Sequence, residues 1–341
     1  MVKKVGVGVI GVGVMGKNHV AAYSKMENAK LVGIADLNAK RAEEVARQFG
    51  VKKWFTDYEK LLKEPELEAV SVVTPDFAHR EIIVKAAEAG KHVLSEKPLA
   101  MSLKECDEII NACRRNNVKL MVHFLNRFSP PMVALHSVVS SGEIGEPIQA
   151  FDRIDDTIYV PTKMLSWAAR TNPGFFLLVH AIDRQRWFLG SEAKEVYATS
   201  VKKVLKSMNI DTEDVIQAIV HFENGAKVYF ESSWILPNSY FTISENQIKI
   251  IGSEGCAYVM PRQPYVTYYN QAGSVSGANM IFKLLKRTPP VSGYQRFIDS
   301  IIDDVMPPVT GEDGRAATEV VLAILKSAAS DKPVKLPLPV E

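Results

Sequence analysis

The sequence predicts an α/β protein with an N-terminal doubly wound domain and a C-terminal α+β domain built on an open, mostly antiparallel sheet. The first third of the chain alternates short apolar runs with amphipathic helical patterns, as parallel sheets covered by helices do. From about residue 125, runs with a period near two predominate, which is typical of antiparallel strands. We therefore expect a first domain at 1–124 and a second at 125–341.

The first expected strand, residues 5–10, leads into the motif Gly11-x-Gly13-x-x-Gly16 and then a helical pattern. Gly11 permits a tight turn, Gly13 lets backbone N–H groups approach a pyrophosphate, and Gly16 lets the helix pack close to the strand. The free N–H groups and dipole of the helix N-terminus favour a bound phosphate. The motif therefore predicts a Rossmann dinucleotide site.

An acidic residue about 20 positions on strengthens this prediction. Asp36 ends the second apolar run, residues 31–35, where a carboxylate accepts hydrogen bonds from ribose hydroxyls and repels a 2′-phosphate. This favours NAD as the cofactor. Lys40 and Arg41 follow closely and leave NADP possible. Strand, glycines and acid together are more specific than the glycines alone.

The rest of the first domain continues the alternation, and two polar motifs stand at strand ends. Helices are expected at 39–48, 57–63, 79–89 and 102–116, and strands at 69–73, 92–94 and 119–122. Thr74-Pro75, with His79, follows the third expected strand, and Glu96-Lys97-Pro98 follows the fourth. Ligands of doubly wound sheets bind at the carboxyl ends of the strands, so both motifs are expected near the cofactor.

Composition excludes several classes of function. Hydrophobic residues make up 47% and charged residues 23%, which are ordinary values for a globular protein. A net charge of +2 without a basic cluster argues against nucleic-acid binding. No apolar stretch of 18 residues and no cleavable signal peptide is evident, so no membrane contact is expected. Cys106, Cys113 and Cys256 lack metal-ligand spacing, which favours reduced thiols and a cytoplasmic location.

The second domain is expected to contain at least five strands. They fall at 148–154, 215–222, 226–233, 247–251 and 265–269. Asn224-Gly225 predicts a hairpin turn between the second and third of these strands. The Gly-, Ser- and Pro-rich residues 273–292 predict an exposed loop, and a closing helix is expected at about 312–330.

These motifs together resemble the family of glucose-fructose oxidoreductase, inositol dehydrogenase and their relatives (Gfo/Idh/MocA). The segments that carry the resemblance span the chain: Val9–Gly16, Thr74-Pro75 with His79, Glu96-Lys97-Pro98, Asn126-Arg127-Phe128, Glu143–Pro147, Gly311–Gly314 and Pro333–Pro337. The resemblance implies hydride transfer between nicotinamide and a secondary hydroxyl or keto group of a sugar, inositol or related polyol. It also implies a homodimer or homotetramer that associates through the C-terminal sheet.

In that family the lysine of the Glu-Lys-Pro motif hydrogen-bonds the reacting oxygen of the substrate. A fixed cation there stabilises the anionic character that the oxygen acquires. By resemblance, Lys97 has this role and its bond to Pro98 is cis. His180 matches the acid/base histidine, since a neutral imidazole can take up the hydroxyl proton. From the local sequence alone, His180 could equally be a core histidine.

The chain departs from the family pattern at one position. Relatives have an acid four residues before the histidine, where this chain has Phe176, and another three residues after it, matched by Asp183. Asp183 could orient His180 or bind a cation on its own helix. Asp152, Asp155 and Asp156 are candidates for a carboxylate that takes the place of the missing acid. The departure keeps two alternatives open: a catalytically silent NAD-binding regulator, and an enzyme that uses NAD to cleave glycosides.

The long connection 156–175 is a candidate substrate lid. Its aromatic rings suit stacking on sugar C–H faces, although Trp167 could instead anchor the connection in the core. Substrate contacts are expected from Lys97, Arg127, Asp156, Tyr159, Trp167, Arg170 and His180. Cofactor contacts are expected from Gly11, Gly13, Val14, Met15, Gly16, Asp36, Thr74, Pro75, His79, Glu96, Lys97 and Asn126. No metal is expected, because His19, His92, His123, His136 and His221 show no ligand spacing.

Overall fold

The computed structural model describes residues 3–260, 263–271, 273–276 and 291–339 of the 341-residue chain. The chain forms two compact units: Met1–Phe124 with Val291–Ala316, and Leu125–Pro290 with Ala317–Val340. The break after Phe124 falls at the expected position, but residues 291–316 lie with the first unit and not with the second. They pack there because α10 (Gly293–Ile302) contacts β1 and α1, and the Val122 N–H donates to the Val309 carbonyl at 3.2 Å.

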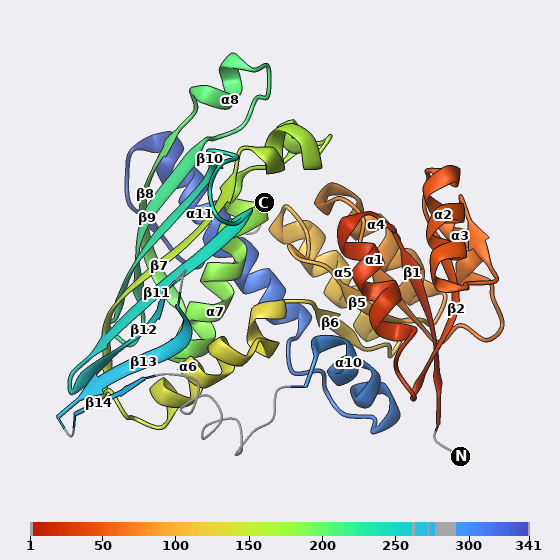
Figure 1. The fold of residues 1–341 in the computed structure, drawn as a ribbon, viewed down its shortest axis with the longest axis horizontal. Coiled ribbons are helices and arrows are strands. Elements are labelled where there is room, and N and C mark those ends of the chain that lie inside the picture. Colours follow the sequence, from red (N-terminus) through yellow and green to blue (C-terminus); the bar gives the residue numbers. More distant parts are fainter. Residues whose placement is uncertain (1–2, 261–262, 272, 277–290, 340–341) are drawn as a thin grey trace. The chain divides into compact units, whose positions relative to one another are not determined.

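The first unit is built on a six-stranded parallel sheet with the strand order β3-β2-β1-β4-β5-β6 (Figure 1). The strands are β1 (Val5–Ile10), β2 (Ala29–Ala35), β3 (Trp54–Phe55), β4 (Ala69–Val72), β5 (His92–Ser95) and β6 (Leu120–Val122). Every residue of β1 is buried, as expected for a strand covered on both faces. Strand β3 was not predicted, because its two residues are too few to show a period.

The helices of this unit before residue 124 are α1 (Val14–Tyr23), α2 (Ala39–Phe49), α3 (Tyr58–Leu62), α4 (His79–Glu88) and α5 (Leu103–Arg115), with a 3₁₀ turn η1 (Asp76–Ala78) before α4. The four helices for which ranges were predicted, α2 to α5, agree with those ranges to within two residues, whereas α10 was not predicted. Side chains cap the helices where the sequence has Asn or Ser: the Asn38 side chain accepts from the Arg41 N–H, and the Ser102 hydroxyl from the Glu105 N–H. Gly50 ends α2 in the left-handed conformation.

The second unit contains a nine-stranded sheet with the order β14-β13-β12-β11-β7-β10-β9-β8-β15. Its strands are β7 (Pro147–Thr157), β8 (Ala193–Val201), β9 (Val215–Phe222), β10 (Lys227–Leu236), β11 (Ser244–Gly252), β12 (Gly255–Met260), β13 (Gln263–Asn270), β14 (Gly273–Ser276) and β15 (Val334–Lys335). All neighbours are antiparallel except β7 and β10, which are parallel. The predicted loop at 273–292 was wrong at its start, where β14 forms, and residues 277–290 lie outside the described part of the chain.

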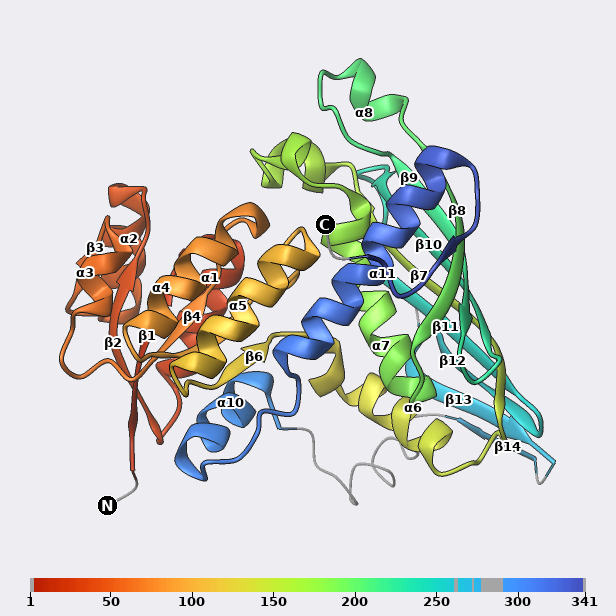
Figure 2. The same ribbon diagram turned by 180° about the vertical axis from the view of Figure 1, so that it is seen from behind.

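The helices of the second unit lie along one face of this sheet, here called the inner face, except for α8 (Val204–Ser207), which stands beyond the ends of β8 and β9 (Figure 2). They are η2 (Leu125–Phe128), α6 (Pro130–Ser140), η3 (Val160–Met164), η4 (Ala168–Arg170), η5 (Gly174–Leu178), α7 (Val179–Leu189), α8 (Val204–Ser207) and α11 (Gly311–Ser330), which belongs to this unit from Ala317 onward. The Ser327 hydroxyl of α11 accepts from the Ala198 N–H of β8 at 2.9 Å. Alternate residues of β8 to β12 are buried against these helices.

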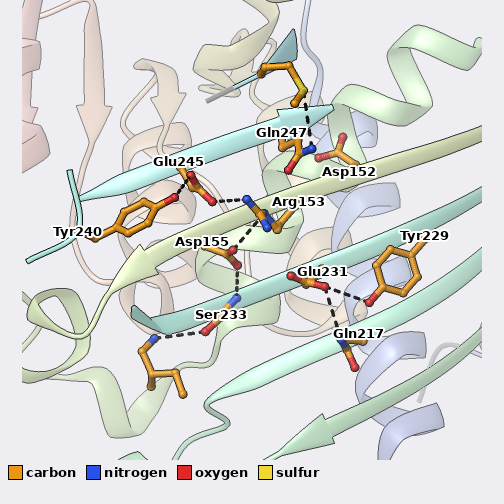
Figure 3. A network of polar contacts seen from close by, with 12 residues as sticks. Asp152, Arg153, Asp155, Gln217, Tyr229, Glu231, Ser233, Tyr240, Glu245 and Gln247 are labelled. Carbon is orange, nitrogen blue, oxygen red and sulfur yellow. Dashed lines mark hydrogen bonds and ion pairs between the residues drawn. The ribbon is translucent and has the colours of Figure 1, made fainter. Parts of the chain in front are cut away.

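The other face of the sheet, the outer face, carries a continuous row of larger side chains. In register across the sheet these are Tyr197, Ile219, Tyr229, Phe151, Lys249 and Tyr258, here called the outer row. The Phe151 and Tyr229 rings stack at 5.5 Å. Beside this row lies a polar network in which Arg153 contacts Asp155 and Glu245 (Figure 3). Among the described helices, none combines the length and apolar content that crossing a membrane requires.

Candidate active site

The turn from β1 into α1 has the shape that a dinucleotide needs. Gly11 has φ +86°, and a Cβ there would lie 2.6 Å from the Val73 carbonyl oxygen. A Cβ on Gly16 would lie 2.0 Å from the Gly11 oxygen, so this helix position requires glycine for close packing. At Gly13, by contrast, a Cβ would meet nothing within 4 Å, and no side chain caps the helix. The loop therefore leaves the helix N-terminus open, which fits a bound pyrophosphate.

Asp36 lies at the end of β2 beside this turn. Its Oδ2 accepts a hydrogen bond from the Val12 N–H and its Oδ1 one from the Asn38 N–H, both at 2.9 Å. A carboxylate oxygen can accept more than one hydrogen bond, so both oxygens can still accept from ribose hydroxyls. Arg41 lies 3.4 Å from Oδ2 and is partly exposed. Backbone N–H groups therefore hold the Asp36 carboxylate in place at the cofactor turn, whereas, among the described residues, the Arg41 guanidinium has no such backbone contact there.

His79 connects the two polar motifs at the strand ends. Its Nδ1 lies 2.7 Å from the Pro98 carbonyl oxygen, and its Nε2 lies 2.9 Å from the carbonyl oxygen of Thr74. The side chain is buried, so His79 is not a surface histidine. It holds the end of β4 against the turn that carries Lys97. Pro75 follows Thr74 and is half-buried.

Glu96 is the centre of a buried network that the sequence analysis did not predict. Its Oε1 lies 2.9 Å from His19 Nε2 and 2.8 Å from His123 Nδ1. The Tyr294 ring packs on both imidazoles. Burial alone would raise the pKa of Glu96, but the two imidazoles hold this pKa well below its usual range, so the carboxylate is ionised. Burial lowers the pKa of His19, so its ring is neutral and donates through Nε2.

These three residues also form a group with metal-ligand chemistry, since one donor atom from each lies within 4.8 Å of the others. That no metal binds here stays a prediction, but the fold brings His19 and His123 together with Glu96 in a grouping that was not expected. Spacing along the chain could not reveal this grouping. His19 lies in α1, Glu96 follows β5 and His123 follows β6, and these elements meet only in the folded unit. The two hydrogen bonds to Glu96 are sufficient to explain the arrangement in the described structure.

Lys97 follows Glu96 directly and is half-buried. The Lys97 N–H lies 3.4 Å from Glu96 Oε2, and the Lys97–Pro98 peptide bond is cis. His19 and His123 hold Glu96, and His79 holds the Pro98 carbonyl, so the residues on both sides of Lys97 are fixed. Such fixation is what a group aimed at a reacting oxygen requires.

In the second unit His180 occupies the first turn of α7 and is 9% exposed. Asp183, one turn on, is fully buried and is held by Arg127 of η2, with distances of 2.9 Å and 2.6 Å to its two oxygens. Arg186 of the same helix is more distant, at 4.0 Å. The cation that Asp183 binds is therefore mainly Arg127. Asn126, the neighbour of Arg127, is buried in η2.

Phe176 fills the position of the missing acid with an aromatic ring. It lies in η5, where its ring centroid is 6.3 Å from that of Trp167 and 6.0 Å from that of Trp234. Trp167 is half-buried in this cluster, whereas Tyr159 and Arg170 are exposed. The connection expected as a long loop is mostly helical, because η3, η4 and η5 occupy it.

Comparison with known proteins agrees with this geometry. Residues 5–124 match the family model described as an oxidoreductase family with an NAD-binding Rossmann fold, and residues 132–258 match the C-terminal domain model of the same family. The oxidoreductase YrbE of Bacillus subtilis, itself uncharacterised, is 30% identical over 98% of both chains. The chain belongs to the Gfo/Idh/MocA oxidoreductase family.

Two further relatives of known activity are similar to the chain over nearly its whole length, and one solved structure shares its fold. The scyllo-inositol 2-dehydrogenase (NAD(+)) of Bacillus subtilis is 30% identical over 96% of this chain and 95% of its own. The myo-inositol 2-dehydrogenase of Thermotoga maritima is 28% identical over 97% and 98%. A levoglucosan dehydrogenase solved with NADH and levoglucosan has the same fold, with a TM-score of 0.86, 24% identity and coverage of 98% and 100%.

Family membership confirms the predicted fold class and the cofactor. The first unit of this Gfo/Idh/MocA protein is an NAD-binding Rossmann fold, and NAD is the cofactor that the open turn and Asp36 fit. Val14 and Met15 start the helix after the glycine turn, the first exposed and the second half-buried. When bound, NAD supplies the acceptor or donor of a hydride.

Proposed function

We propose that the protein is an NAD-dependent dehydrogenase that transfers a hydride between nicotinamide and a secondary hydroxyl or keto group of a sugar, inositol or related polyol. The main support is the position of Lys97, which follows β5 at the same carboxyl edge of the parallel sheet as the glycine turn and Asp36. The names of the relatives agree, since several act on inositols or on levoglucosan.

The chemical roles follow from the charge changes of the reaction. As hydride leaves a secondary alcohol, the oxygen loses its proton and gains anionic character before the carbonyl forms. Lys97 stabilises this oxygen, and His180 takes up the proton or returns it in the reverse direction. Asp183 holds Arg127 in place. We propose that Arg127, Asp156, Tyr159, Trp167 and Arg170 contact the substrate, with the exposed aromatic and cationic groups selecting among polyols.

The first experiment is a fluorescence titration of the purified protein with NADH and NADPH, followed by mixing with keto-sugars and keto-inositols. Tight NADH binding and loss of nicotinamide absorbance with one of them would support the proposal. Lys97→Ala should then reduce kcat by at least about 100-fold, because it removes the fixed cation at the reacting oxygen. Lys104→Ala, an exposed lysine on α5, is the matched control. Turnover by Lys97→Ala at the wild-type rate would refute this role.

Phe176 supports a second candidate, a regulator that binds NAD without turnover. Its ring belongs to an aromatic cluster with Trp167 and Trp234, so this position supplies no carboxylate. Tight NADH binding without oxidation by any keto-polyol would favour this candidate. Release of an aglycone without net NADH formation would identify an NAD-dependent glycoside-cleaving enzyme instead.

We also propose that the protein forms a homodimer or homotetramer through the outer face of the sheet. The outer row presents several half-buried or exposed large side chains, including Tyr197 and Ile219, which a second copy would cover. Size-exclusion chromatography with light scattering tests this, and Ile219→Lys should shift the mass toward the monomer. A cytoplasmic location is proposed because the described cysteines are free thiols.

A further inference from the structure

The inner face of the second unit sets helix α7 and strand β7 in a defined register. At one end, Arg184 of α7 binds Asp152 of β7, with 2.9 Å between Arg184 Nε and Asp152 Oδ2. At the other end, the Phe176 ring lies 6.0 Å from that of Trp234. Ser232 and Ser233 pair with Ile154 and Asp155 in the parallel ladder, whose register then shifts before Leu236 pairs with Thr157, so Trp234 lies near the end of β7 that carries Asp156. Helix and strand therefore run in opposite directions.

The spacings of the two elements place Asp156 beyond His180, toward the start of the helix. His180 and Arg184 are four residues apart on one side of α7, about 6 Å along the helix at 1.5 Å per residue, and Phe176 precedes them in the π-helical segment η5. Asp152 and Asp156 are separated by about 13 Å along the strand. Since Arg184 contacts Asp152, Asp156 lies opposite the turn from Phe176 to His180. The missing acid of the helix thus has a carboxylate facing it from the strand.

Strand alternation selects Asp156 from the three acids of β7. Asp152, Ile154 and Asp156 point to the inner face, where Asp156 is 3% exposed. Asp155 points to the outer face, where its carboxylate accepts from the Ser233 N–H at 2.7 Å and lies beside Arg153 (Figure 3). The carboxylate of Asp152 is occupied by Arg184 and Gln185.

We propose that Asp156, on strand β7, has the role of the helix acid that Phe176 replaces. Asp156 is the positioning residue that orients the His180 imidazole and balances its charge. This inference rests on the proposed dehydrogenase function. In the oxidative direction the hydroxyl proton passes to His180 while the hydride passes to the bound nicotinamide. Asp156 remains ionised and stabilises the imidazolium. The other charged groups beside His180 on α7 and β7 are held in pairs, Asp183 with Arg127 and Asp152 with Arg184.

The pairing is tested first without turnover. The pKa of His180 is measured by NMR of protein labelled at histidine Cε1, with the resonance assigned from His180→Gln. Asp156→Asn should lower this pKa by about one unit or more, because a carboxylate within about 4–6 Å favours the protonated ring. Asp155→Asn, one residue away on the other face, should leave it unchanged. An unchanged His180 pKa in Asp156→Asn would overturn the proposal.

The second test uses whichever keto-polyol the wild-type protein reduces. Asp156→Asn should lower kcat about 100-fold and move the limb of the pH profile that reports His180, with NADH affinity retained. Phe176→Asp added to Asp156→Asn should restore part of this activity, since it returns a carboxylate to the helix. A loss without any shift of the pH profile would mean a merely structural role. If the wild type reduces nothing, the proposed function fails, while the NMR titration still decides the pairing.

Discussion

The ion pair between Arg184 and Asp152 offers the sharpest test of how the second unit is held together. Both side chains are completely buried, and Arg184 makes two contacts to the carboxylate and one to the Asn246 side chain. Gln185 donates to the same carboxylate at 2.7 Å. Arg184→Met keeps an unbranched apolar stem but leaves the Asp152 charge without its cation.

Removing one partner of a buried pair typically costs about 3–5 kcal/mol, because the other charge stays in a low-dielectric interior. For a unit of this size, each kcal/mol shifts the thermal midpoint by about 2–4 °C. Arg184→Met should therefore lower the midpoint of the second unit by roughly 6–20 °C. Asp152→Asn in the same chain removes the stranded charge and keeps an oxygen for Gln185, so the double variant should recover at least half of the loss.

The assays are thermal unfolding followed by circular dichroism, which gives the midpoint, and urea unfolding, which gives the free energy of unfolding for each variant. Arg80→Met is the matched control, since Arg80 and Glu108 form an exposed pair on the first unit. Loss of such a pair costs less than about 1 kcal/mol. If Arg184→Met costs no more than the control, or if the double variant is less stable than the single one, the account of a buried, fully paired charge is refuted.

Three further predictions concern the two units separately. Gly16→Ala should weaken NADH binding about tenfold or more in a fluorescence titration, because its Cβ would lie 2.0 Å from the Gly11 oxygen; unchanged affinity would contradict the packing. His123→Phe removes a donor to buried Glu96 and should cost about 1–3 kcal/mol of unfolding free energy. Burial raises the pKa of Asp155 to about 7 in the folded state, so this state binds the proton more tightly than the unfolded chain. The free energy of unfolding should therefore fall by up to about 4 kcal/mol as pH rises from about 4 to 7, and Asp155→Asn should flatten this slope.

Most of the fold could be predicted from local sequence patterns. These patterns, the apolar run of β1, the glycine motif and the caps of α2 and α5, each span only a few residues, so they predict the Rossmann unit from the sequence. Strands β3 and β15, with two residues each, are too short to show a period. Strands β8, β12 and β14 were also missed. The long-range return of residues 291–316 to the first unit depends on packing against β1 and α1, which no local pattern records.

The sequence by itself determined the family, the NAD fold and the identity of Lys97 and His180 as candidates, because each depends on residue types at short, fixed spacings. Only the tertiary structure decided which side chains meet. The fold brings His19 and His123 to Glu96 from separate elements, and it pairs the Asp183 carboxylate with Arg127. It also separated three nearby acids of β7, since alternation along a strand sends Asp155 to one face and Asp152 and Asp156 to the other. The amino-acid sequence shows that successive side chains of β7 alternate between two faces, but only packing determines which of these faces contacts α7.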